Sequence, residues 1–286
     1  MSAAGPCPEP IAQPLARGGE GGRVNGAGSP TATPDPMALA GVCASMGPPV
    51  LSLHAAGVTL GATTALTEVT LTLHRGERLV LVGSNGAGKT TLLRLLHGVV
   101  RPQAAAQRQV HRSQPARGGV LGAMVFQRPF FLRLSVRRNL RLALWLHGVP
   151  RAGREAQARL ALQRVGLEVL AERPAHTLSA GQQQRLALAR AWALRPEVLF
   201  LDEPTASLDP AAKREVEALI DGIAREGVTL VMSTHNLGQA KRLASRVAHL
   251  EGGRLLALEP VDRFFGAAVL PAPTRLFLKG ELPWTA

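Results

Sequence analysis

Residues 83–90 have the types and the spacing needed to hold a phosphate group: Gly83-Ser84-Asn85-Gly86-Ala87-Gly88-Lys89-Thr90. They fit the pattern G-x-x-x-x-G-K-[ST], in which glycines allow backbone N–H groups to surround phosphate oxygens. Lys89 would add a positive charge near the β- and γ-phosphates, and Thr90 would offer a hydroxyl ligand to Mg²⁺, with Thr91 beside it. The apolar run 79–82 predicts a strand before the loop, and residues 90–97 predict a helix after it. A glycine-rich turn without a ligand is the alternative, which this context disfavours.

Two adjacent carboxylates, Asp202 and Glu203, follow the apolar run 198–201. Ligands of open α/β sheets bind at the carboxyl ends of the strands, where a strand over 198–202 would deliver both acids. Because successive strand residues point to opposite faces, we expect the two acids to differ in role. Asp202 suits Mg²⁺, and Glu203 suits polarisation of an attacking water. A solvated acidic turn is the alternative, which the phosphate-binding loop in the same chain disfavours.

A third motif lies between these two, Leu178-Ser179-Ala180-Gly181-Gln182. It resembles the LSGGQ signature of the ATP-binding cassette (ABC) ATPases. It is also a capping box, in which Ser179 at the N-cap and Gln182 at N3 would satisfy the first free N–H groups of a helix over 180–194. A merely well-capped helix is therefore the alternative for this motif taken alone.

Further landmarks of the same family stand in order along the chain. Gln127 resembles the glutamine of the Q-loop, Asp209 in Ser207-Leu208-Asp209 resembles the aspartate of the D-loop, and His235 resembles the switch histidine. The resemblance covers about residues 50–265 and rests on five ordered motifs.

The resemblance implies an α/β fold, a P-loop ATPase cassette with an antiparallel β subdomain and a helical subdomain. It also implies ATP and Mg²⁺ as cofactors, and a homodimer in which each ATP lies between one subunit's phosphate-binding loop and the other's signature helix. A lone subunit should therefore hydrolyse ATP poorly. The residues implied at the nucleotide are Gly83, Ser84, Asn85, Gly86, Ala87, Gly88, Lys89, Thr90, Thr91, Ser179, Ala180, Gly181, Gln182 and Asp209. Those implied in catalysis are Glu203, His235 and Gln127, and those implied at the metal are Thr90, Gln127 and Asp202.

Two features depart from the family pattern. The chain contains no tyrosine, and Leu60 stands where the family places an aromatic residue against the adenine. Leucine packs on a purine face without aromatic stacking, so we expect ATP and GTP to be poorly discriminated. Ala180 replaces a glycine of the signature and adds a methyl group near the phosphates, which we expect to be tolerated.

The elements that must position these residues can be read from apolar patterning. Residues 66–73 alternate apolar and polar, as a half-buried strand does. Short apolar runs that are typical of buried parallel strands lie at 79–82, 198–202, 229–233 and 246–250.

Between about 128 and 195 the pattern is helical instead. A helix over 135–147 would place on one stripe Val136, Leu140, Leu144 and His147. A second amphipathic helix is predicted over 153–165. The whole pattern predicts an α/β core with a helical insertion.

The first 49 residues differ from the rest of the chain. They hold nine Gly and nine Pro without a periodic apolar pattern, so we expect a disordered extension. An ATPase domain is then expected over 50–270, with its helical subdomain at about 128–195, and a C-terminal tail over 271–286.

Composition excludes several classes of protein. Cys7 and Cys43 are too few for a disulfide scaffold or a four-thiolate zinc site. The chain contains no run of 18 apolar residues, so no segment is expected to span a membrane. The formal charge is +13, and residues 128–195 hold 13 Arg against three acidic residues. We interpret this excess as a surface near a permease and an anionic membrane, with a solvated arginine-rich face as the alternative.

We therefore expect ATP hydrolysis that drives import through separate transmembrane permease subunits, served by an extracytoplasmic substrate-binding protein. The chain would lie peripherally at the cytoplasmic face of the inner membrane. Candidate contacts with the permease are Phe130, Phe131 and Trp145, with ordinary helix core as the alternative. Residues 274–284 resemble the C-terminal tail of tungstate and phosphate importers, and no β-rich regulatory extension of the molybdate type follows. Tungstate is the expected substrate, and phosphate or molybdate is the alternative.

A second class of function keeps the ATPase and acts on nucleic acid, which a charge of +13 would suit. Against it stand the lack of long coiled coils and the single cassette, so no nucleic-acid partner is expected. A binding module that has lost hydrolysis is a third possibility, and the intact Lys89, Asp202, Glu203 and His235 oppose it.

Overall fold

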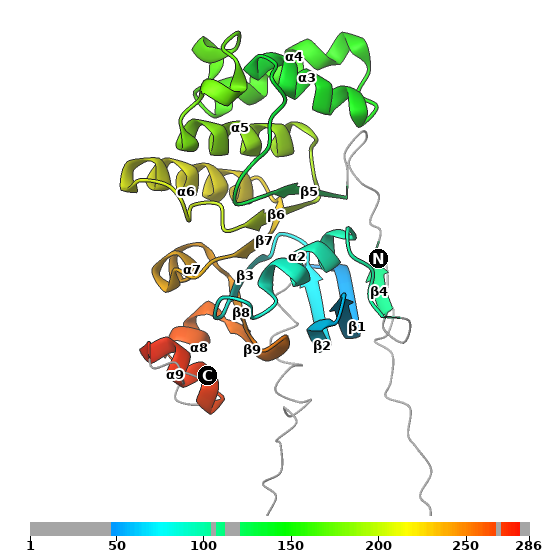
Figure 1. The fold of residues 1–286 in the computed structure, drawn as a ribbon, viewed down its shortest axis with the longest axis vertical. Helices are drawn as coiled ribbons and strands as arrows, with labels where there is room; N and C mark the ends of the chain where they lie inside the picture. The colour runs from blue at the N-terminus through cyan, green and yellow to red at the C-terminus, as the bar shows by residue number, and fades with distance from the viewer. Residues whose placement is uncertain (1–46, 104–106, 112–120, 267–269, 281–286) are drawn as a thin grey trace, which may run out of the picture. The chain divides into compact units, whose positions relative to one another are not determined.

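Two β-sheets form the framework of the protein in this computed structural model, which describes residues 47–103, 107–111, 121–266 and 270–280 (Figure 1). The first sheet is antiparallel, in the order β2-β1-β4. Its strands are β1 (Pro49–Leu60), β2 (Thr63–His74) and β4 (Gln107–Val110). In β2 the apolar residues Val69, Leu71 and Leu73 are buried and the polar ones between them are not, as the alternating pattern predicts.

Most of the predicted N-terminal extension lies outside the described residues. Only residues 47–49 of it are described, and β1 begins at Pro49. The described part of the predicted C-terminal tail forms the helix α9 (Ala272–Lys279), and residues 281–286 lie outside the described ranges.

The second sheet contains the predicted buried strands. Its order is β5-β6-β7-β3-β8-β9, with parallel pairing from β5 to β8 and an antiparallel edge strand, β9. Its strands are β3 (Arg78–Val82), β5 (Gly122–Val125), β6 (Val198–Asp202), β7 (Thr229–Ser233), β8 (Arg246–Glu251) and β9 (Arg254–Pro260). Because β3, β7 and β6 are parallel neighbours, the loop after β3 and the acids at the end of β6 emerge at the same edge of the sheet.

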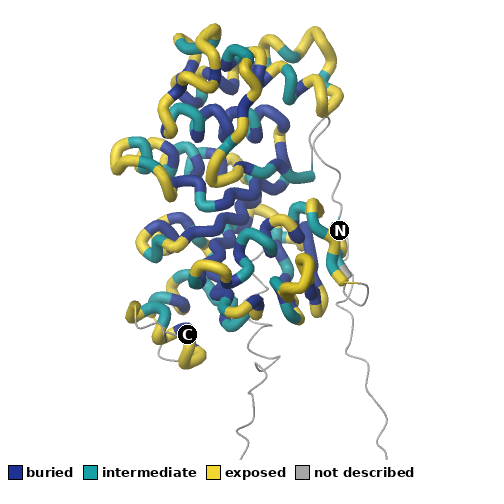
Figure 2. Tube along the Cα trace, in the orientation of Figure 1, coloured by how far each residue is buried: buried dark blue, intermediate teal, exposed yellow. Residues whose placement is uncertain are grey.

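Alternate residues of β3 enter two separate hydrophobic cores, one on each face of this sheet. Val80 and Val82 pack into the core that also contains Val216 and Ile220 of α6 (Pro210–Arg225). Leu79 and Leu81 pack into the core shared with the antiparallel sheet and with α2 (Lys89–His97). Covering both faces explains why the central strands are continuously apolar, and Figure 2 shows them buried between exposed outer surfaces.

Residues 128–195 are all described and contain helices and no strand. The helices are α3 (Val136–Leu146), α4 (Arg151–Arg164) and α5 (Ala180–Ala193), with short 3-10 turns at Glu168–Leu170 and Ala175–Thr177. Val136, Leu140 and Leu144 are buried on one stripe of α3, as predicted. The prediction for His147 is wrong, because α3 ends at Leu146 and His147 is an exposed C-cap whose Nδ1 lies 2.9 Å from the Ala143 carbonyl oxygen.

Three further short helices complete the described chain. They are α7 (Leu237–Leu243), α8 (Val261–Gly266) and α9. α7 follows β7 and begins at Asn236, whose Oδ1 accepts a hydrogen bond from the Gln239 backbone N–H at 2.8 Å. None of the helices in the described ranges is long and apolar enough to cross a lipid bilayer.

Candidate functional site

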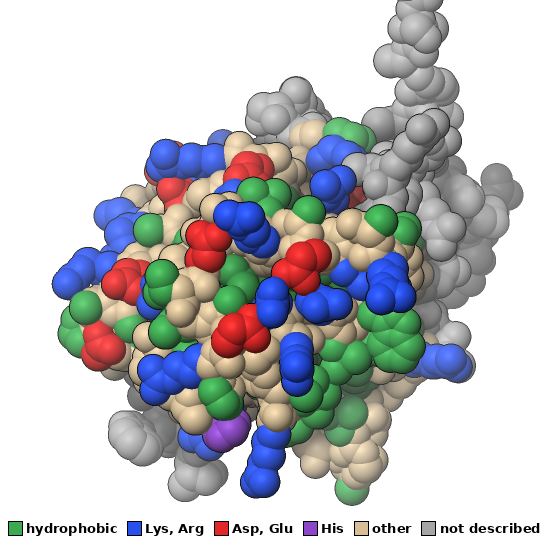
Figure 3. All heavy atoms as spheres, turned by 90° about the horizontal axis from the view of Figure 1, so that it is seen from above, with side chains coloured by type: hydrophobic (Ala, Val, Ile, Leu, Met, Phe, Trp, Pro, Cys, Tyr) green, Lys and Arg blue, Asp and Glu red, His purple; other side chains and the backbone are tan. Residues whose placement is uncertain are grey.

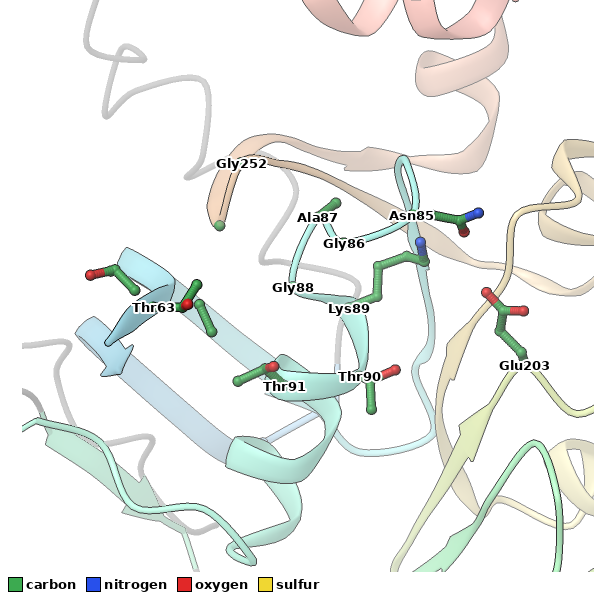
Figure 4. Close-up of a pocket in the computed structure, with 13 residues that line it drawn as sticks. Thr63, Asn85, Gly86, Ala87, Gly88, Lys89, Thr90, Thr91, Glu203 and Gly252 are labelled. Atoms are coloured by element: carbon green, nitrogen blue, oxygen red, sulfur yellow. The ribbon is translucent and has the colours of Figure 1, made fainter. Parts of the chain in front are cut away.

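The phosphate-binding loop joins β3 to α2 and forms one wall of a cavity of about 410 Å³ (Figure 4). Glu203 and seven of the predicted loop residues line this cavity, namely Asn85, Gly86, Ala87, Gly88, Lys89, Thr90 and Thr91. The other two, Gly83 and Ser84, hold Lys89 instead. The Nζ of Lys89 donates hydrogen bonds to the carbonyl oxygens of Gly83 (2.9 Å) and Ser84 (2.7 Å).

The Lys89 ammonium is a partly desolvated charge. Burial lowers its pKa from the ordinary value, while the carboxylates of Glu203, Asp202 and Glu251 act in the opposite sense. An anion bound beside such a group interacts with it more strongly than it would in water. Because α2 begins at Lys89, the positive end of the helix dipole adds to this attraction. The loop is therefore suited to a polyphosphate.

Gly83 is required by a close contact as well as by its backbone conformation. Its φ is +147°, and a Cβ there would lie 2.0 Å from the Leu250 carbonyl oxygen at the end of β8. We expect Gly83→Ala to lower the free energy of unfolding by about 3 kcal/mol, because a backbone atom blocks the methyl group.

Gly86→Ala is the matched control in the same loop. Gly86 has a φ of +82°, but a Cβ there would meet nothing within 4 Å. The backbone conformation alone should then cost about 1 kcal/mol. Urea unfolding measures both variants, and equal losses would show that the Leu250 contact does not matter.

Asp202 is fixed against the phosphate-binding loop. Its side chain is buried, and its Oδ1 accepts hydrogen bonds from Thr90 Oγ1 (2.9 Å) and Ser233 Oγ (2.8 Å). Thr90 lies in the first turn of α2, and Ser233 is the residue of β7 that pairs with Asp202 in register. The strand order therefore brings this carboxylate to the threonine hydroxyl.

The oxygen atoms of Thr90 and Asp202 suit Mg²⁺, a hard cation that takes oxygen ligands and is commonly held by one or two protein groups plus phosphates and waters. No cluster of three or more His, Cys, Asp or Glu side chains that could enclose a metal ion occurs in the described part of the chain. A metal held at this hydroxyl–carboxylate pair would therefore need nucleotide phosphates or water as further ligands.

Glu203 has an unusual backbone conformation, with a φ of +44°. Its backbone N–H donates to the Ser233 carbonyl oxygen (3.2 Å) and to Ser233 Oγ (3.0 Å). Its Oε2 lies 3.1 Å from Nδ1 of His235, an exposed residue that follows β7. A left-handed non-glycine residue is strained, and such strain concentrates at functional sites. Glu203 thus lines the cavity while being held by groups of β7 and the segment after it.

The signature segment presents a helix N-terminus outside the cavity. Ser179 Oγ accepts from the Gln182 backbone N–H (3.3 Å), and Gln182 Oε1 accepts from the Ser179 backbone N–H (3.0 Å), which is the predicted capping box. Ser179 and Ala180 are exposed, so the Ala180 methyl group meets no crowding within its own subunit. Among the described residues that line the cavity, none belongs to α5.

The N-termini of α5 and α6 approach closely at Gly181, and Asp209 caps α6. A Cβ on Gly181 would lie 2.7 Å from the Cβ of Ala212, which leaves room for glycine alone. Asp209 caps α6, and its Oδ1 accepts from the backbone N–H groups of Ala211 and Ala212, both at 2.9 Å. These backbone donors, with Ala212 foremost, lower the pKa of the exposed Asp209 carboxyl.

Two parts of the cavity wall come from residues that the sequence motifs do not include. Residues 63–65 at the start of β2 contribute one part, and Gly252 and Gly253 in the turn between β8 and β9 contribute the other. The glycine pair between two apolar runs is a usable turn signal, whereas residues 63–65 carry no comparable signal. Leu60 ends β1, is exposed, and is not among the described residues that line the cavity.

Gln127 is exposed and also stands outside the cavity lining in the described structure. It follows β5, which pairs in parallel with β6. Gln127 therefore emerges at the same edge of the sheet as Asp202 and Glu203 without a direct contact to either.

The aromatic residues of the helical region divide into two groups. Phe130 is 74% exposed and Trp145 is 55% exposed. Phe131 is buried, and the Arg190 guanidinium lies 4.9 Å from the centroid of its ring. The prediction that Phe131 offers a surface contact is therefore wrong, because its ring belongs to the helix core.

The arginine excess of the helical region is partly neutralised by local ion pairs. Arg137 pairs with Glu155 at 3.0 Å and with Glu172 at 2.6 Å, and Arg159 pairs with Glu168 at 3.1 Å. Figure 3 looks onto the end of the molecule where α3 and α4 lie, and it shows basic side chains interspersed with acidic and hydrophobic ones. The surface is thus mixed and basic rather than a continuous positive field.

Comparison with known proteins places this geometry in a family. The family described as ABC transporter matches residues 66–206. The phosphate import ATP-binding protein PstB 2 of Natronomonas pharaonis is 37% identical over 252 residues, which is 80% of this chain and 87% of that protein. The tungstate uptake system ATP-binding protein TupC of Peptoclostridium acidaminophilum is 35% identical over 203 residues, which is 68% of this chain and 91% of that protein.

Other similarities vary in coverage. The methionine import ATP-binding protein MetN of Mesorhizobium japonicum is 38% identical, and the match spans 72% of this chain but only 59% of that protein. The solved structure of cbiO1 from Clostridium perfringens, part of an ABC transporter complex, has a TM-score of 0.68 and 27% identity, covering 77% of this chain and 91% of that one.

A second solved structure is an ATP-binding cassette in a dimeric, post-hydrolysis state bound to ADP and phosphate. It has a TM-score of 0.64 and 25% identity, and covers 74% of this chain and 98% of that one. The fold agrees with these structures, and the sequence is similar to these proteins over most of its length. The chain therefore belongs to the ABC transporter family, as one of its ATP-binding subunits.

Proposed function

We propose that the chain is the ATP-hydrolysing subunit of an importer and works as a head-to-tail homodimer on membrane-spanning permease subunits. One observation in particular supports the head-to-tail dimer. The capped N-terminus of α5 at Ser179 is exposed, and none of the described residues that line the phosphate-binding cavity belongs to α5. A second copy that placed its α5 over the cavity would supply a helix N-terminus to the γ-phosphate. The resemblance to a dimeric cassette bound to ADP and phosphate supports the same arrangement.

In this proposal each predicted residue acts on ATP or its metal. Thr90 and Asp202 would hold Mg²⁺, with Gln127 as a further ligand, and the bound ion would neutralise phosphate charge. Glu203 orients a water for in-line attack on the γ-phosphorus, and the bond to the β-phosphate oxygen breaks. His235, 3.1 Å from Glu203, holds that carboxylate in position. Catalysis of this kind is mostly positioning and charge stabilisation.

We place the permease contact on the helical region, at the exposed side chains of Phe130 and Trp145. Large exposed apolar groups with a polar surround mark interaction sites, and aromatic residues are common anchors in interfaces. The chain would then lie at the cytoplasmic face of the inner membrane, with an extracytoplasmic binding protein delivering substrate to the permease. The basic surface beside these residues would face anionic lipid headgroups.

Tungstate is the proposed cargo, and phosphate is the second candidate. The C-terminal segment 274–284 and the similarity to a tungstate uptake protein support tungstate. The longer similarity to a phosphate import protein, over 252 residues, favours phosphate. Both are tetrahedral oxyanions that other subunits would recognise.

Uptake measurements in cells of the source organism test the proposal. Cells in which the chain carries Glu203→Gln should lose at least about 90% of tungstate uptake while phosphate and molybdate uptake stay unchanged, since a roughly 100-fold slower ATPase cannot sustain transport. Loss of phosphate uptake alone would identify phosphate as the cargo. Unchanged uptake of all three oxyanions would contradict oxyanion import. Glu172→Gln, at an exposed surface carboxylate, is the matched control.

A further inference from the structure

The end of β8 and the turn that follows it contact the phosphate-binding loop at three points. Ser84 Oγ donates a hydrogen bond to Glu251 Oε1 at 2.7 Å. The Gly253 backbone N–H donates to the Ala87 carbonyl oxygen at 3.2 Å. Gly83 packs directly against the Leu250 carbonyl oxygen. Of the three contacts, that between Ser84 and Glu251 is made by side chains, so substitution can remove it without altering the backbone.

Behind Glu251 in β8 lies His249, which is bound to the C-terminal helix α9. His249 Nδ1 lies 2.9 Å from Thr274 Oγ1, and both residues are fully buried. The His249 ring also stacks on the ring of Phe277, with 4.6 Å between the centroids and an interplanar angle of 24°. One turn of α9 thus holds the imidazole through a hydrogen bond and a ring contact.

His249 and Glu251 face each other across a short gap. His249 Nε2 and Glu251 Oε2 lie 3.9 Å apart, and both atoms are buried without a hydrogen-bond partner among the described residues. Burial lowers the pKa of His249, which favours the neutral ring, while the Glu251 carboxylate acts in the opposite sense. Because a carboxylate can only accept hydrogen bonds, the tautomer of a neutral ring that suits this position carries its proton on Nε2. Nδ1 is then the acceptor of the hydrogen bond from the Thr274 hydroxyl. A displacement of about 1 Å would close the gap to a hydrogen bond.

We propose that Glu251 is a positioning residue for the phosphate-binding loop, and that α9 holds Glu251 in place through His249. Glu251 orients Ser84 by accepting its hydroxyl hydrogen bond, and Ser84 in turn accepts a hydrogen bond from Lys89 through its carbonyl oxygen. In this proposal the orientation of the Lys89 ammonium depends on a series of residues that begins at Thr274 and includes the 3.9 Å approach of His249 to Glu251. The inference rests on the nucleotide site of the proposed function and is independent of dimer, permease and cargo.

Calorimetric titration of ADP with Mg²⁺ into the purified full chain tests this, because ADP binding requires neither hydrolysis nor a second subunit. Glu251→Ala should weaken ADP binding about 10-fold, and Glu251→Gln, which keeps an acceptor for Ser84, should restore it to within about 3-fold. Thr274→Val, which keeps the shape and removes the hydroxyl, should weaken ADP binding about 3-fold. Arg275→Ala, on the exposed side of the same helix, is the matched control and should leave ADP affinity unchanged.

The double variant decides whether α9 acts through Glu251. If it does, Thr274→Val should add no further loss of ADP affinity in a Glu251→Ala background. Independent, additive losses would overturn the relay, and unchanged affinity in Glu251→Ala would overturn the positioning role. Melting temperatures without nucleotide identify loss of folding, and a variant that melts early yet binds ADP normally would also count against the proposal. Normal ADP effects with failed oxyanion uptake would leave this inference standing while the cargo assignment fell.

Discussion

Glu203→Gln should lower the ATP turnover of the assembled transporter at least about 100-fold while leaving ATP affinity within about 3-fold, the range expected when a general base is removed from a positioned site. Glutamine has the shape of glutamate but cannot accept a proton from the attacking water. The backbone N–H of Glu203 still donates to Ser233, so the strained conformation at φ +44° is retained. His235 Nδ1 can still contact the amide oxygen at the position of Oε2, 3.1 Å away in the parent protein.

Separate measurements of ATP turnover and ATP affinity distinguish a loss of catalysis from a loss of binding. Steady-state phosphate release reports turnover, and equilibrium titration of ATP reports binding. Glu172→Gln removes a carboxylate of an exposed ion pair with Arg137 and should change neither quantity by more than about 2-fold. Near-normal turnover in Glu203→Gln would mean that another group orients the water.

The second large effect is expected at Lys89. Lys89→Met should weaken ATP binding about 100-fold or more, because the variant loses the partly desolvated ammonium that lines the cavity, and water cannot replace its attraction for phosphate. Methionine has a similar length and no charge, so it should still fit where the lysine chain lies buried between α2 and the loop. The loss should therefore appear in binding and not in folding.

The lowered pKa of Lys89 predicts the direction in which Lys89→Met changes the stability of the folded protein. Burial lowers that pKa in the folded protein, so folding disfavours the charged form. This cost to stability is present below the folded pKa and disappears as the pH rises through the pKa of the unfolded chain. Removing the charge should leave the melting temperature without nucleotide equal to or above that of the parent. Saturating ATP should raise the melting temperature of the parent protein but not that of Lys89→Met. A variant that melts early, or one that ATP still stabilises, would contradict this account of Lys89.

Much of the nucleotide site follows from local sequence patterns. The strand–loop–helix at 79–97 and the capping box of Ser179 and Gln182 are each formed by neighbours in the chain, and the structure contains both. The buried strands β6 and β7 follow from unbroken apolar runs, because both faces of the central sheet are covered. Patterns of this kind depend on residues within a few positions of one another, so a single sequence carries them.

Other features depend on which distant segments meet. The order β6-β7-β3 brings Asp202 to Thr90 and Ser233, although 112 and 31 positions separate them, and no local pattern encodes that order. Phe131 looks like a surface anchor beside Phe130 until the packing of α5 places Arg190 over its ring.

The origin of the rest of the site is equally nonlocal. Residues 63–65 and the turn Gly252-Gly253 line the same cavity although they lie near opposite ends of the domain's sequence. Thr274, which contacts His249, belongs to the C-terminal helix. The sequence thus determines the chemical groups and the local turns that present them. Only the tertiary structure decides which groups share a cavity, because long-range strand pairing and close packing depend on the whole chain at once.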